Sequence, residues 1–136
     1  MVALDSIPDA LRCELEASFP DRRLLGAWLY GSRAEGRDRA DSDIDIAVLC
    51  DARLEPVALF DAAGRLAARL GAAVDLVDLR QAGGLLRVEA THRGRALVPT
   101  TTEADFFTAH ALADHAAFAA NRRAATAALR EKFGAR

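Results

Sequence analysis

The sequence contains few residues of the kinds that mark specialised protein classes. Its 136 residues include only two cysteines, one tryptophan and one tyrosine, and aromatic residues make up 6% of the chain. The two cysteines show no CxxC or CxxH spacing, which argues against a disulfide scaffold and against a cysteine-based zinc site. We therefore expect Cys13 and Cys50 to be reduced and to pack as small apolar side chains.

Long apolar runs and a strong charge of one sign are missing as well. No segment approaches the roughly 20 apolar residues that cross a bilayer, and the first ten residues lack the order of a signal peptide. We expect a cytoplasmic protein without membrane contact. The formal net charge is −2, so we also expect no direct nucleic-acid binding. A chain of this length is expected to form a single domain over residues 1–136.

Apolar periodicity and turn residues predict alternating helices and strands, and therefore an α/β fold. Strands are predicted at residues 24–30, 43–50, 73–79 and 95–98, and helices at about residues 7–19, 56–70, 85–91 and 103–133. Thr102 is the expected N-cap of the long last helix. The helix at residues 56–70 is expected to bury a face that comprises Val57, Phe60, Ala63, Gly64, Ala67 and Leu70.

The most informative stretch runs from Leu29 to Asp51 and reads LYGSRAEGRDRADSDIDIAVLCD. Its first strand leads into a Gly31-Ser32 turn, whose N–H groups are able to face an anion. Its second strand begins with Asp43 and Asp45, which alternate onto the same face. Two carboxylates on an apolar strand repel each other, and a divalent cation relieves that repulsion. An anion-binding turn beside a metal site indicates a nucleoside triphosphate.

The order Gly-Ser, ten residues, then Asp-x-Asp resembles the nucleotidyltransferase superfamily related to DNA polymerase β. The chain looks like the minimal nucleotidyltransferase (MNT) branch, whose members often act as antitoxins to helical HEPN ribonuclease toxins. The resemblance covers roughly residues 4–100, with the long C-terminal helix beyond it. It implies a small mixed β-sheet that carries the acids on one face and helices on the other. It also implies transfer of AMP from ATP to a hydroxyl group.

The same resemblance implies a pair of Mg²⁺ ions held by Asp43, Asp45 and a third aspartate from the following strand. Asp75 and Asp78 are both available there, but they are three residues apart and face opposite sides of a regular strand. In the family that the chain resembles, the third aspartate lies in an apolar strand after the intervening helix, as Asp75 does in VDLV. The resemblance therefore implies that Asp75 is the third ligand, and a carboxylate there is able to take the proton.

The phosphate-binding residues are expected in the turn that follows the first strand. Gly31 allows the backbone to approach the phosphates, and Ser32 offers a hydroxyl and an N–H. Arg33 and Arg37 either contact the leaving phosphates or pair with the neighbouring charges of their loop.

The acceptor is expected to be a protein, because a single helix beyond the core is too little to enclose a small substrate. The resemblance implies a HEPN toxin modified on a tyrosine hydroxyl. Phe107, Phe118 and Leu129 are eleven residues apart, so they share one stripe of a helix that should overrun the domain and contact the toxin. Two alternatives remain: a small-molecule (aminoglycoside-type) nucleotidyltransferase with a pocket across a dimer, and a non-catalytic antitoxin.

Overall fold

The computed structural model describes residues 8–31 and 43–133, and it contains every secondary-structure element that the sequence predicts. The helices and strands, in chain order, are α1 (Pro8–Ser18), β1 (Leu24–Tyr30), β2 (Ile44–Cys50), α2 (Pro56–Leu70), β3 (Val74–Asp78), α3 (Gly84–Val88), the π-helical turn η2 (Glu89–Arg93), β4 (Arg95–Ala96) and α4 (Thr102–Phe133). Strands β2 and β3 are shorter than predicted by one and two residues.

The four strands form one sheet in the order β3-β2-β1-β4. Strand β2 is parallel to β3, whereas β1 is antiparallel to both β2 and β4, so the expectation of a small mixed sheet is confirmed. The central strand β2 is the most deeply buried element, since every residue from Ile46 to Cys50 is inaccessible to solvent. A strand with both faces covered is apolar throughout, and only the start of β2 departs from that pattern.

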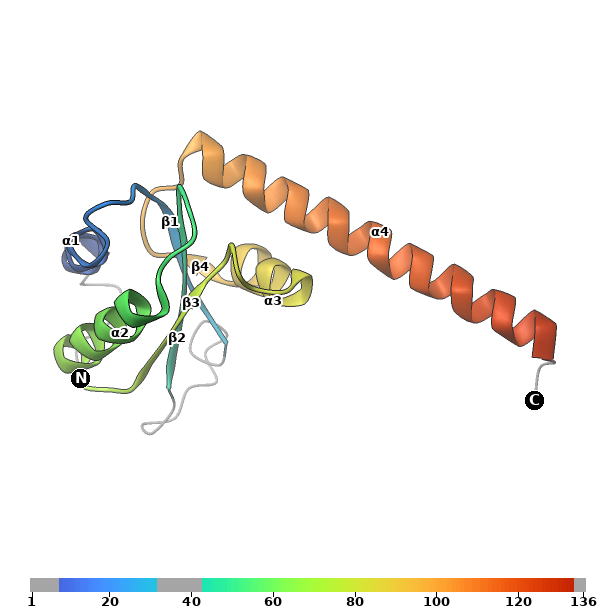
Figure 1. Cartoon of the computed structure of the whole chain (residues 1–136), viewed down its shortest axis with the longest axis horizontal. Coiled ribbons are helices and arrows are strands. Elements are labelled where there is room, and N and C mark those ends of the chain that lie inside the picture. Colours follow the sequence, from blue (N-terminus) through green and yellow to red (C-terminus); the bar gives the residue numbers. More distant parts are fainter. Residues whose placement is uncertain (1–7, 32–42, 134–136) are drawn as a thin grey trace.

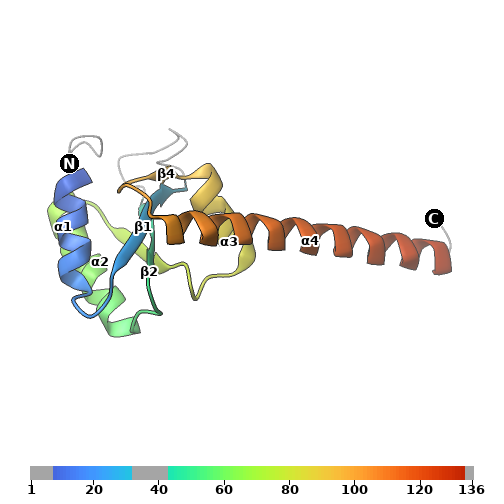
Figure 2. The ribbon, with the colours of Figure 1, turned by 90° about the horizontal axis from the view of Figure 1, so that it is seen from above.

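Helices cover both faces of the sheet (Figures 1 and 2). Leu15 of α1 and Leu66 of α2 lie in one hydrophobic cluster with Ile46 of β2, on one face of the sheet. On the opposite face, Trp28 of β1 packs with residues from η2 and the start of α4. Helices α1 and α2 therefore cover one face of the sheet, whereas η2 and the start of α4 pack on the other face.

The buried face of α2 agrees only in part with the one that the sequence pattern predicted. Leu70 is buried and Ala63 and Ala67 are half-buried as predicted, but Val57 is 71% and Phe60 80% exposed. The other buried residues of the helix are Ala62 and Leu66, which were not predicted. Apolar residues lie nearly all round this helix, so two different stripes satisfy the spacing of three and four residues. Only contact with the sheet decides between them.

Helix α4 runs far beyond the rest of the molecule, as the length of the predicted helix indicated (Figure 1). Its N-cap is Thr101, one residue earlier than predicted, and the Thr101 hydroxyl accepts a hydrogen bond from the Ala104 N–H at 3.1 Å. Cys50 is buried as expected, but Cys13 is exposed on α1. Within the described ranges, the helices are all too short or too polar to span a membrane.

Asp78 at the end of β3 holds two loops together. Its side chain is only 2% exposed, and it accepts hydrogen bonds from the Leu54 N–H at 2.9 Å, the Arg80 N–H at 3.0 Å and the Gln81 side-chain amide at 2.8 Å. The first of these comes from the connection between β2 and α2, and the other two come from the turn after β3. Asp78 is therefore a structural residue whose carboxylate satisfies buried donors.

Replacing Asp78 by alanine should lower the free energy of unfolding by at least about 2 kcal/mol, because buried N–H groups left without an acceptor cost about 1–3 kcal/mol each. Asp75→Ala, on the exposed aspartate of the same strand, is the matched control and should not lower stability, because it removes a charge that repels Asp45. Urea unfolding followed by circular dichroism measures both. Equal losses in the two variants would contradict the role given to Asp78.

Candidate active site

Three side chains form a row across β1, β2 and β3. Tyr30 is the partner of Asp45 in the antiparallel pairing of β1 with β2, and Asp45 is the partner of Asp75 in the parallel pairing of β2 with β3. Residues paired on neighbouring strands lie about 4.8 Å apart and point to the same face. Asp43 precedes β2 by one residue and is exposed, as is Asp75, while Asp45 is half-buried.

The carboxylates of this row influence one another. Burial is the main cause that raises the pKa of Asp45, and the charges of Asp75 and then of Asp43 raise it further. Burial also raises the pKa of Tyr30 to about 12, with contributions from Asp45 and Asp75. Three negative charges thus gather at one edge of an otherwise apolar face, and a cation bound there would relieve their repulsion.

Gly31 brings the turn after β1 against these carboxylates. Its φ of +76° lies in the left-handed region that favours glycine. A Cβ atom added at this position would collide with the carboxylate of Asp45. The backbone of the turn therefore lies directly beside Asp45, and no other residue fits there without a shift. The predicted phosphate ligands Ser32, Arg33 and Arg37 lie outside the described residues, so their roles stay predictions.

The structure separates the two aspartates of β3. Asp75 lies beside Asp45 on the face of Tyr30, whereas Asp78 points to the opposite face and is occupied by its three hydrogen bonds. The row therefore includes Asp75 and excludes Asp78. A position near the end of a strand predicts that Asp78 either caps backbone N–H groups or faces solvent. The hydrogen bonds that it accepts from the Arg80 and Leu54 N–H groups show that it caps.

The donor chemistry of the row suits Mg²⁺. Within residues 8–31 and 43–133, no three or more His, Cys, Asp or Glu side chains converge on one point. Mg²⁺ does not require such a cage, since proteins usually hold it with one or two carboxylates together with water and substrate phosphates. Asp45 and Asp75, paired across strands and joined by Asp43, offer the hard oxygen ligands that this mode needs.

The position of Tyr30 at the end of an apolar strand predicts a core residue and gives no connection with the acidic residues. The side chain is indeed buried, with 8% exposed, but its partner across the strands is Asp45. A register between β1 and β2 was needed to find this neighbour, and the long loop between the two strands hides that register in the sequence. Arg87 and His92, whose spacing resembles a ribonuclease motif, instead bind backbone carbonyls of Leu79, Arg80 and Thr108.

The comparison with family models assigns the chain that carries this Gly turn and these paired carboxylates to a family. The model of the polymerase beta nucleotidyltransferase domain matches residues 15–103, which is well over half of the chain. The chain belongs to the polymerase beta nucleotidyltransferase family. The expected fold class is thereby confirmed.

Relatives of this nucleotidyltransferase include enzymes of toxin–antitoxin systems. The protein adenylyltransferase MntA of Shewanella oneidensis is 34% identical over 110 residues, which are 81% of this chain and 78% of MntA. A chain from the crystal structure of the toxin–antitoxin MntA–HepT is 28% identical with a TM-score of 0.72, and the match covers 92% of this chain and 97% of that chain.

Two further solved structures are similar. One contains a tri-AMPylated HEPN toxin of Shewanella oneidensis in complex with MNT antitoxin; its matching chain is 28% identical, with a TM-score of 0.72 over 93% of this chain and 98% of that chain. The other is a toxin–antitoxin structure with AMP-PNP, in which the matching chain is 30% identical, with a TM-score of 0.72 over 86% of this chain and 96% of that chain.

Asp45→Asn should make the nucleotidyltransferase more stable at neutral pH. The raised pKa of Asp45 means that its ionised form destabilises the folded state, so the penalty appears as the pH rises through the folded-state pKa and is absent at lower pH. The gain in melting temperature should therefore be present at pH 7 and shrink towards pH 4. Calorimetry across this range measures it, and an Asn variant less stable than the parent at pH 7 would contradict the electrostatic account.

Proposed function

We propose that this chain is an antitoxin that transfers AMP from ATP to a hydroxyl group, that of a tyrosine, on a HEPN-type ribonuclease toxin and thereby neutralises it. The observation that carries the proposal is the row of Asp45 and Asp75 beside the Gly31 turn, on the fold of a nucleotidyltransferase family. The adenylyltransferase MntA and the complexes of MNT antitoxins with HEPN toxins support the choice of AMP and of the acceptor.

In this proposal the two strands divide the chemistry. Asp43 and Asp45 on β2 hold Mg²⁺, and Asp75 on β3 completes the metal site and accepts the proton of the attacking hydroxyl. Bound Mg²⁺ supplies charge neutralisation for the triphosphate and for the nucleophile. The Gly31 turn keeps the backbone close to the carboxylates, so that its N–H groups reach the phosphates. The acceptor oxygen bonds to the α-phosphorus, the bond to the β-phosphate oxygen breaks, and pyrophosphate leaves.

Half-burial of the site assists this reaction. The Tyr30 side chain and the apolar residues of the same face limit water around Asp45. Charges interact more strongly where water is partly excluded, so positioning and electrostatic stabilisation account for most of the expected rate enhancement. The neutral phenol of Tyr30 adds no further charge, because its pKa of about 12 keeps it protonated at physiological pH.

Combined replacement of Asp43 and Asp45 by asparagine should abolish AMP transfer while the protein stays folded. Asparagine keeps the shape of each side chain but removes the charges that hold Mg²⁺. Purified chain, toxin and ATP labelled in the α-phosphate give the readout, with Asp61→Asn on the exposed side of α2 as control. Chelation by EDTA should stop the parent enzyme, and added Mg²⁺ should restore it. Full labelling of the toxin by the double variant would contradict the assignment of Asp43 and Asp45 to the active site.

Asp75→Asn should lower kcat by at least about a hundredfold, as expected for loss of a general base and a metal ligand. The comparison variant is Asp78→Asn. Because Asp78 is buried and hydrogen-bonded, this variant is expected to lose stability. Its activity must therefore be measured at a temperature where the variant remains folded. Under that condition it should retain most of the activity. The reverse order of effects would mean that Asp78 rather than Asp75 acts in the site.

The same assay distinguishes the alternatives. A toxin whose mass never changes with ATP and Mg²⁺, although the complex forms and growth is rescued, identifies a non-catalytic antitoxin. Labelling of an aminoglycoside in the absence of any protein partner identifies a small-molecule enzyme. A rise of the toxin mass by one or more AMP units supports the proposed function.

A further inference from the structure

The outer part of α4, residues 112–133, forms an arm that extends away from the sheet (Figures 1 and 2). The buried residues of α4 are Ala104 and Ala111, both near its start, and no residue of the arm is buried. Large apolar side chains are nevertheless present on it: Phe118 is 65%, Leu129 57% and Phe133 72% exposed. Large apolar side chains that are exposed along one segment are typical of a surface that binds another molecule.

The base of the arm is fixed to the strands that carry the acidic row. The ring of Phe107 on α4 lies 5.0 Å from the Arg87 guanidinium and 5.8 Å from that of Arg80. Arg80 donates a hydrogen bond to the Cys50 carbonyl at the end of β2, and Arg87 donates to the Leu79 carbonyl just after β3. A molecule bound to the arm is therefore held in a defined orientation relative to Asp45 and Asp75.

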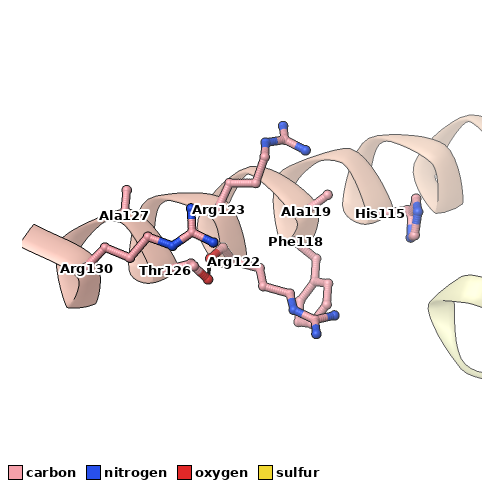
Figure 3. A pocket seen from close by; sticks show the side chains of 8 residues that line it. All are labelled: His115, Phe118, Ala119, Arg122, Arg123, Thr126, Ala127 and Arg130. Atoms are coloured by element: carbon pink, nitrogen blue, oxygen red, sulfur yellow. Dashed lines mark hydrogen bonds between the residues drawn. The ribbon is translucent and has the colours of Figure 1, made fainter. Parts of the chain in front are cut away.

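A hollow of about 560 Å³ lies between the start of α3 and the arm. Leu85 of α3, which is 69% exposed, faces it together with Phe118 and Arg122 of α4. The hollow continues along α4, where Phe118 and Arg122 project to the same side of the helix and Arg123 projects to the other side (Figure 3). Asp114 also lines the hollow beside α3, whereas Arg122, Arg123 and Arg130 follow farther along α4. The surface therefore combines an apolar centre with a basic margin on its outer part.

The arm also differs in charge from the rest of the chain. From residue 112 to residue 133 there are four basic residues and two acidic residues, a net charge of +2. The basic residues are Arg122, Arg123, Arg130 and Lys132, and the acidic ones are Asp114 and Glu131. Because the whole chain has a net charge of −2, the remainder carries −4. Two arms packed together would bring like charges into contact, which disfavours a second copy in that arrangement.

We propose that the arm together with Leu85 binds an acidic helix of the protein acceptor through an apolar face of that helix. Apolar centre and basic margin match such a helix, since interfaces are apolar at the core and polar at the rim. Exposed Leu85 and Leu129 favour a protein over RNA, which binds through stacking and phosphate contacts. This inference rests on the proposed function, because it takes the acceptor to be the helical toxin.

Comparison with the complexes supports the assignment. The matches to chains solved together with HEPN toxins cover 92% and 93% of this chain, which leaves about ten residues unmatched. The arm has more than twice that number of residues, so a large part of it belongs to the fold shared with chains that are bound to a helical partner.

The test uses this chain co-expressed with the HEPN-type toxin that the proposed function assigns to it. Phe118→Ser removes the apolar centre, and the pair Arg122→Glu and Arg123→Glu reverses the charge. Phe106→Ser is the matched control, because Phe106 is an equally exposed phenylalanine (66%) on a different side of the same helix. All of these side chains are exposed, so the far-ultraviolet circular dichroism and melting temperature should stay unchanged.

Each arm variant should weaken toxin binding by at least about tenfold in a titration of purified proteins, the size expected for a central interface residue. The KM for the toxin in AMP transfer should rise by the same factor, whereas kcat at saturating toxin and the affinity for ATP should not change. Phe106→Ser should behave like the parent. Unchanged toxin affinity in the arm variants would overturn the proposal.

Two further measurements decide between occupants. Light scattering on the chain alone reports a second copy: a dimer that Phe118→Ser converts to a monomer, without effect on toxin binding, would contradict a toxin-binding arm. Fluorescence anisotropy with a single-stranded RNA 20-mer measures binding of nucleic acid. RNA binding that is lost in the charge-reversal variant, while the affinity for the toxin is unchanged, would also contradict a toxin-binding arm. A parent chain that binds toxin through the arm but never transfers AMP would overturn the proposed function and leave this inference standing.

Discussion

The parallel register between β2 and β3 is the constraint on which the rest of the site depends. It places Asp45 opposite Asp75, and it is fixed by backbone hydrogen bonds such as the one from the Ile44 N–H to the Ala73 carbonyl at 2.8 Å. A slip of one residue would move Asp75 to the buried face that holds Asp78. Such a slip is disfavoured because it would bury the exposed carboxylate of Asp75 and take Asp78 away from its three hydrogen-bond donors. Catalytic geometry and core packing are therefore specified by the same pairing.

The acidic residues lie at the start of β2, where the strand leaves the core. Farther along the strand every residue is inaccessible, and a carboxylate there would lack both water and a partner. At the edge, burial is only partial, so Asp45 is ionisable although its pKa is raised. The chain keeps the repulsion between Asp43, Asp45 and Asp75 at a cost in stability, which is the compromise expected of a site that binds a metal and a nucleotide. By contrast, the fully buried Asp78 has donors on several sides and stabilises the fold.

The arginines that follow the core strands link this site to α4. Arg80 and Arg87 satisfy carbonyls at the ends of β2 and β3 and also contact the ring of Phe107. Contact of one aromatic ring with two guanidinium groups resists reorientation of the helix, because both arginines are already held by hydrogen bonds to the backbone. The direction of the long helix is thus set by the strands that carry the acidic row, which lets one molecule present a nucleotide site and a partner surface in fixed relation.

The sequence by itself determined the elements, the fold class and the aspartates of β2, because strand alternation and turn chemistry are local. Strand parity also showed that only one of Asp75 and Asp78 is able to join them, and the family resemblance favoured Asp75. It did not decide which face of α2 is buried, since the apolar residues around Val57 and Leu66 satisfy two stripes. Nor did it reveal that Tyr30 adjoins Asp45 or that Arg87 contacts Phe107, because these neighbours are brought together by pairing and packing between segments distant in the chain. Local patterns carry periodicity, whereas register and helix orientation are set only when the whole core is assembled.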